Sequence, residues 1–100
     1  MVDAGMIPTV LVTDDDADFR GVVCEALVRG GVQTQQAADG DEALRVIERT
    51  AIHMVLLDVH MPRVTGLDVM RILSQRPNAM PYVLMSALMD EAIEREAARM

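Results

Sequence analysis

Four oxygen-bearing residues stand where short apolar runs of this sequence end. Asp14 and Asp15 follow the run TVLVT, Asp58 follows MVLL, and Ser86 follows YVLM. Beyond Asp58 the chain continues VHMPRVTG, in which a proline and then a glycine predict a sharp turn. An acid at the end of a buried strand and directly before a turn is placed at a surface, where it can react.

The three acids predict a site for phosphoryl chemistry. Three carboxylates within about 5 Å of one another repel by roughly 3 kcal/mol per pair at an effective dielectric constant near 20, so such a cluster favours a divalent cation or a proton. Mg²⁺ prefers hard oxygen ligands, keeps several waters and accepts a phosphoryl oxygen. Asp58 is then the candidate nucleophile, because an aspartate held beside Mg²⁺ can attack phosphorus. Ser86 would be placed to hydrogen-bond the new phosphoryl group.

The elements expected to position these residues alternate between short apolar runs and amphipathic segments, which is typical of a parallel sheet covered by helices. We expect strands at residues 9–13, 32–37, 54–57 and 82–85, and helices at 17–29, 41–49, 66–75 and 89–99. Right-handed crossovers should join the strands. In such sheets, ligands bind at the carboxyl ends of the strands where strand order reverses. If the first and third strands are neighbours, their acids converge in one shallow pocket.

The hydrophobic pattern also predicts which strands are central in the sheet and which strand lies at an edge. Residues 9–13 and 54–57 lack polar alternation and read as central strands, whereas residues 32–37, VQTQQA, read as a polar edge strand. Gly30 and Gly31 should end the first helix, and Asp39 and Gly40 predict a turn. Cys24 lies on a helical pattern and is interpreted as a small packing residue.

Composition limits the function classes. The chain has 100 residues, 51% of them hydrophobic and 25% charged, which fits one small globular domain over residues 1–100. Its net charge is -7 and its nine basic residues are all arginine, which argues against direct nucleic-acid binding. The sequence shows neither an apolar run of 18 residues nor a signal peptide, so we expect no membrane association and a cytoplasmic location.

Simpler interpretations exist for each acid alone. The run DDD can be a solvated N-cap before a helix, and Asp58 can cap the segment that follows it. A haloacid-dehalogenase-like phosphatase would use the spacing of Asp14 and Asp16, with Asp14 as the nucleophile. That class also requires a lysine, which this chain lacks, and it leaves the motif D-x-x-M-P unexplained.

The segments TVLVTDDDADFR, AADGDEALRVIE, MVLLDVHMPRVTGLDVM and PYVLMSA resemble successive signatures of the receiver domain of two-component response regulators. The resemblance runs from about residue 9 to at least residue 87. It implies an α/β, flavodoxin-like, doubly wound parallel sheet with strand order 2-1-3-4, the family's fifth strand being missing. It implies the following roles: Asp14 and Asp15 as the acidic pair that binds Mg²⁺, Asp58 as phosphoacceptor and metal ligand, the backbone carbonyl of His60 as a further metal ligand, and Ser86 as the switch hydroxyl.

The function implied by the resemblance is phosphoacceptor signalling. Asp58 would receive a phosphoryl group from a histidine kinase or phosphotransfer protein in a Mg²⁺-dependent reaction. Ser86 would then turn toward the phosphoryl group, and a shift between two surface states would be read by an output domain or a downstream protein. Self-phosphorylation and self-dephosphorylation are the only reactions expected, so the domain is not interpreted as an enzyme.

The sequence departs from the family at its end. The family's fifth strand, the lysine that ends it and the fifth helix have no counterpart here. Either the chain is a receiver truncated after its fourth helix, which we favour, or it is a natural variant, which leaves open a pseudo-receiver that binds partners without being phosphorylated. If the chain is complete, residues 82–85, YVLM, would form an exposed apolar edge strand, which predicts homodimerisation or strand exchange.

Overall fold

The computed structural model describes residues 7–58, 61, 64–75 and 81–85. Its elements, in chain order, are β1 (Thr9–Thr13), α1 (Ala17–Arg29), β2 (Gln33–Ala37), α2 (Gly40–Arg49), β3 (Met54–Asp58), α3 (Gly66–Ser74) and β4 (Tyr82–Met85). The seven predicted elements that fall in this range are confirmed to within one residue at each end. The helix predicted at residues 89–99 lies outside the described residues.

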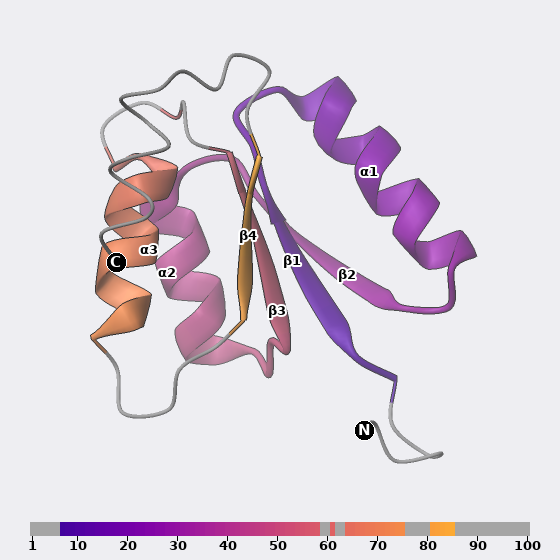
Figure 1. The fold of residues 1–100 in the computed structure, drawn as a ribbon. Coiled ribbons are helices and arrows are strands. Elements are labelled where there is room, and N and C mark those ends of the chain that lie inside the picture. The colour runs from indigo at the N-terminus through magenta and orange to yellow at the C-terminus, as the bar shows by residue number, and fades with distance from the viewer. Residues whose placement is uncertain (1–6, 59–60, 62–63, 76–80, 86–100) are drawn as a thin grey trace.

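The four strands form one parallel sheet with the order β2-β1-β3-β4, as predicted (Figure 1). β1 is parallel to both its neighbours, and its last residue, Thr13, lies opposite Ala37 of β2 and Leu57 of β3. The chain therefore crosses from β1 to β2 at one edge and returns past β1 to β3. This reversal of strand order places the carboxyl ends of β1 and β3 side by side.

Helices cover both faces of this sheet (Figure 1). On one face α2 and α3 pack against the larger core cluster, which contains Leu11, Val55, Leu57, Val69 and Leu73. On the other face α1 packs over β1 and β2. The smaller cluster between them contains Val10, Val12 and Cys24. Cys24 is buried and free, so its interpretation as a packing residue is confirmed.

The two central strands differ in burial. Every residue of β1 is buried, as its unbroken apolar pattern predicted. In β3, Val55 and Leu57 are fully buried, whereas Met54 is 37% exposed and Leu56 is partly exposed. β3 is central by its hydrogen bonding, but its apolar run is not buried equally on both faces. Among the described residues, α1 contacts mainly β1 and β2, so the face of β3 that carries Met54 and Leu56 is covered less completely.

Glycines and acidic caps define the ends of the helices. Gly30 caps the end of α1, and Gly31 has a positive φ of 93°, a backbone conformation that glycine adopts without strain. Asp39 is the N-cap of α2, because its side chain accepts a hydrogen bond from the backbone N–H of Glu42. The predicted turn at Asp39 and Gly40 is therefore the beginning of this helix. None of the helices within the described range is long and apolar enough to span a membrane.

Candidate metal and phosphoacceptor site

Asp14 and Asp58 reach the same edge of the sheet because their strands are adjacent and in register. Thr13 lies opposite Leu57 in the paired strands. The residues that follow them, Asp14 and Asp58, therefore lie together at the carboxyl ends of β1 and β3. Asp58 is the last residue of β3. The backbone N–H of Asp14 donates a 3.1 Å hydrogen bond to the carbonyl of Ala37, which ties this position to β2 as well.

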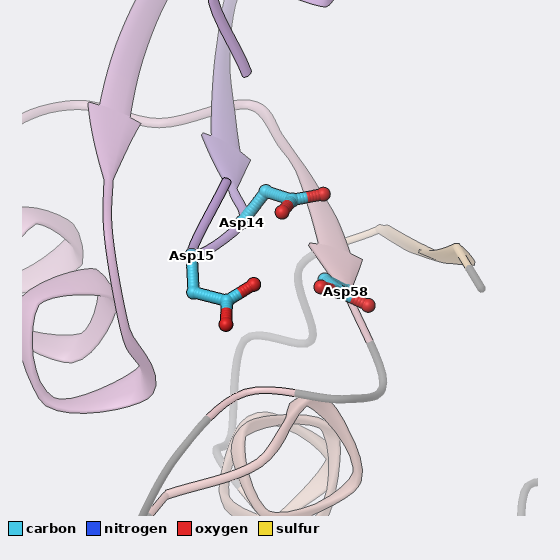
Figure 2. A group of neighbouring side chains, drawn as sticks. All are labelled: Asp14, Asp15 and Asp58. Carbon is cyan, nitrogen blue, oxygen red and sulfur yellow. The ribbon is translucent and has the colours of Figure 1, made fainter. Parts of the chain in front are cut away.

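Three carboxylates converge there, from Asp14, Asp15 and Asp58 (Figure 2). One oxygen of each lies within 4.8 Å of the others. Asp14 is buried, Asp58 is partly buried and Asp15 is exposed. The predicted cluster is thus confirmed as a spatial arrangement, open to solvent on the side of Asp15.

The donor set fits a hard divalent cation. Magnesium–oxygen distances near 2.1 Å place opposite ligands of one ion about 4.2 Å apart. Neighbouring ligands of an octahedral ion are closer, about 3.0 Å apart. The three carboxylate oxygens lie within 4.8 Å of one another, so side-chain rotations that shorten these distances would let all three reach one ion. The repulsion among three carboxylates at this distance favours uptake of a cation. Asp14 can still contribute one oxygen, because only its Oδ1 accepts the 2.9 Å hydrogen bond from the backbone N–H of Asp16.

Asp16 has a different role from the two aspartates that precede it, Asp14 and Asp15. Its Oδ1 accepts hydrogen bonds from the backbone N–H groups of Asp18 and Phe19, at 3.0 and 3.1 Å. It is the N-cap of α1, where a carboxylate also interacts favourably with the helix dipole. The simpler interpretation of the DDD run as an N-cap therefore holds for Asp16, while Asp14 and Asp15 join the cluster. A phosphatase-like pairing of Asp14 with Asp16 finds no support in this geometry.

The remaining predicted site residues, Ser86 and His60, lie outside the described residues. One contact near the cluster was not predicted: the guanidinium of Arg20 donates a 2.7 Å hydrogen bond to the backbone carbonyl of Asp14. No periodicity or motif points to this contact, because the arginine reaches back from α1 to the loop that precedes it. Its position six residues after Asp14, within the helix that the loop begins, is the only hint in the sequence.

Known proteins resemble the chain along nearly its whole length. A family model described as "Response regulator receiver domain" matches residues 10–100. The chain is 32% identical over 87 residues to "Response regulator RR06" of Streptococcus pneumoniae, a match that covers 87% of this chain and 40% of that protein. It is 36% identical over 80 residues to "Transcriptional regulatory protein PrrA" of Mycobacterium leprae, covering 80% of this chain and 34% of that protein. The chain thus spans less than half the length of these two curated relatives.

A solved structure is also similar to the chain over most of its length. The chemotaxis protein CheY4 of Vibrio cholerae superposes with a TM-score of 0.83 at 27% identity, over 94% of this chain and 80% of that one. The similarity therefore extends across the sheet and helices that carry the acidic cluster.

Proposed function

The chain belongs to the response regulator receiver domain family, the phosphoacceptor domains of two-component signalling, and on that premise we propose that Asp58 receives the phosphoryl group in this protein. The observation that carries the proposal is the convergence of Asp14, Asp15 and Asp58 within 4.8 Å at the end of two adjacent strands. This arrangement offers a nucleophile and two further oxygen ligands for one cation.

Burial favours Asp58 over Asp14 as the nucleophile. Asp14 is only 6% exposed, and its Oδ1 is held by the backbone N–H of Asp16. Asp58 is less buried and ends its strand, where a phosphoryl donor can approach. Asp15 is exposed and next to Asp14, so its role is that of a metal ligand at the open side of the cluster.

In the proposed reaction, a carboxylate oxygen of Asp58 attacks the phosphorus of a phosphohistidine. The new oxygen–phosphorus bond forms an acyl phosphate, the phosphorus–nitrogen bond breaks, and the imidazole leaves. Bound Mg²⁺ would neutralise charge on the phosphoryl oxygens during transfer. Asp14 and Asp15 would hold the ion, together with Asp58 and, by resemblance to the family, the backbone carbonyl of His60. By the same resemblance, Ser86 would hydrogen-bond the phosphoryl group after transfer.

The proposed partners follow from this chemistry. The phosphoryl donor is a histidine kinase or phosphotransfer protein, and the reader of the switch is an output domain or a downstream protein. The two curated relatives named above are much longer than this chain, so an output domain is proposed by analogy with them. A cytoplasmic location, where such donors present their phosphohistidine, belongs to the same proposal. Self-association through β4 stays a prediction.

The test is intact-mass spectrometry of the purified protein after incubation with acetyl phosphate and Mg²⁺. We expect a single phosphoryl adduct on the wild-type protein, no adduct when Mg²⁺ is replaced by a chelator, and no adduct on Asp58→Asn. An adduct that persists on Asp58→Asn and disappears on Asp14→Asn would support the phosphatase-like alternative. A folded wild-type protein that takes no phosphoryl group would contradict the proposal and favour a pseudo-receiver.

A further inference from the structure

Arg20 joins three parts of the molecule beside the acidic cluster. It lies in the first turns of α1, and its guanidinium makes two hydrogen bonds that leave the helix. Nη1 donates to the backbone carbonyl of Asp14 at 2.7 Å, and Nε donates to Oε1 of Gln36 at 2.9 Å. Through this one side chain, α1 is hydrogen-bonded both to the loop after β1 and to the end of β2.

The carbonyl held by Arg20 belongs to the peptide unit that joins Asp14 to Asp15. The backbone N–H of Asp14 donates to the carbonyl of Ala37 in β2, and the backbone carbonyl of Asp14 accepts the hydrogen bond from Arg20. The orientation of this peptide plane determines the direction in which the backbone of Asp15 leaves the sheet. Within the described part of the chain, the carboxylate of Asp15 makes no hydrogen bond, so the backbone is what positions it.

Arg20 provides this restraint without neutralising the cluster. Its two acceptors are a carbonyl and an amide oxygen, and neither is a carboxylate. The carboxylates of Asp15 and Asp14 therefore stay available for a cation. A guanidinium suits this task because its fixed planar array of donors can hold two acceptors in a defined geometry.

We propose that Arg20 is a positioning residue for the magnesium site, which orients Asp14 and Asp15 through their shared peptide unit. The inference rests on the proposed function, because it assumes that the cluster binds Mg²⁺. Loss of an outer partner of a metal ligand typically weakens metal binding by about 10- to 100-fold, so we expect Arg20→Gln to weaken Mg²⁺ binding by about tenfold.

The sign of the effect separates positioning from simple electrostatics. Removing a positive charge near an acidic site should strengthen binding of a cation, or leave it unchanged where salt screens the charge. Positioning predicts the opposite, a weaker site. Arg29 offers a matched control, since it lies on the same helix and its exposed guanidinium pairs with Glu25 one turn away. Arg29→Gln removes the same charge and leaves the loop intact.

The experiment is calorimetric titration of Mg²⁺ into the wild-type protein, Arg20→Gln, Arg20→Lys, Gln36→Ala and Arg29→Gln, with thermal melts to show that each is folded. We expect weaker binding for Arg20→Gln, partial recovery for Arg20→Lys, which keeps one donor for the carbonyl, and an intermediate loss for Gln36→Ala. Arg29→Gln should bind as the wild type does, to within about twofold.

Two results would overturn the inference and are distinguishable. If the wild type binds Mg²⁺ and Arg20→Gln binds it equally well or more tightly, the positioning role is wrong while the proposed metal site stands. If the folded wild type binds no Mg²⁺, the metal site and the positioning role fail together. If Arg20→Gln does not fold, Arg20→Lys provides the test. Mg²⁺ binding by Arg20→Lys that is as tight as that of the wild type would contradict the need for a guanidinium that holds two acceptors.

Discussion

At the scale of single residues, neighbouring acids of this chain have different tasks that their type alone does not reveal. Asp15 contributes to the acidic cluster, whereas the carboxylate of Asp16 accepts hydrogen bonds from two backbone N–H groups at the beginning of α1. The two side chains carry the same charge and follow each other in sequence. Substituting each by asparagine therefore separates the effect of a ligand from the effect of net charge.

We expect Asp15→Asn to weaken Mg²⁺ binding by at least about tenfold, because loss of a direct ligand should cost no less than loss of an outer partner. Asp16→Asn should bind Mg²⁺ nearly as the wild type does. It should lose no more than about 1 kcal/mol of stability, because asparagine is as good an N-cap as aspartate and only the interaction of the charge with the helix dipole is removed. Calorimetric titration at constant ionic strength measures both affinities. Equal losses in the two variants would show that affinity follows overall charge and not the geometry of the cluster.

The three acids could be predicted from the sequence, because residues of a site at the edge of a parallel sheet must follow the strands directly. Asp14 and Asp58 end apolar runs, and parallel pairing of those runs was enough to predict that the acids converge. The contact of Arg20 with Asp14 could not be predicted, because the arginine side chain reaches back from α1 to a carbonyl of the preceding loop. Any exposed arginine of an amphipathic helix has the same local pattern.

At the scale of elements, two helical glycines face different surroundings. A Cβ on Gly40, the first residue of α2, would lie 2.4 Å from the backbone carbonyl oxygen of Val64 and 2.6 Å from its Cγ1. Gly40 thus allows α2 to approach the segment that leads into α3. A Cβ on Gly21, within α1, would meet no atom within 4 Å.

These surroundings predict opposite effects of alanine. Gly21→Ala should stabilise the protein by about 0.5–1 kcal/mol, because alanine has the higher helix propensity and loses less backbone entropy on folding. Gly40→Ala should destabilise it by about 1–3 kcal/mol, because a backbone carbonyl must shift to accommodate the methyl group. Chemical denaturation of both variants and the wild type measures the free energy of unfolding. A neutral or stabilising Gly40→Ala would show that the contact with Val64 relaxes easily.

Elements were easier to predict than the contacts between them. Strand and helix periods are local, so their ends agree with the prediction to within one residue. The approach of Gly40 to Val64 joins residues far apart in sequence, and the pair Asp39-Gly40 suggested only a turn. The capping box of α3 was visible in principle: Thr65 accepts from the backbone N–H of Asp68, whose carboxylate accepts from the backbone N–H of Thr65, in the spacing T-x-x-D.

At the scale of the whole molecule, the proposed metal site would link metal binding to folding. Asp14, Asp15 and Asp58 come together only when β1 and β3 pair, so the unfolded chain does not hold the site. The folded protein then carries the repulsion among the three carboxylates, in a chain whose net charge is already -7. Metal-free protein should therefore be less stable than its core would allow.

We expect Mg²⁺ to raise the stability of the wild-type protein by about 2.7 kcal/mol at a free concentration 100 times its dissociation constant. For a chain of this size that corresponds to a shift of the melting temperature by roughly 10–20 °C. Asp58→Asn should behave in the opposite way. Without metal it should be more stable than the wild type by on the order of 1 kcal/mol, because one charge leaves the cluster and solvent at the exposed side of the cluster screens much of the repulsion. It should gain much less stability from Mg²⁺ than the wild type does. Thermal melts of both proteins with and without Mg²⁺, at matched ionic strength, test this reciprocal pattern. A metal-free Asp58→Asn that melts below the wild type would mean that the contacts of this carboxylate within the fold outweigh the repulsion it causes.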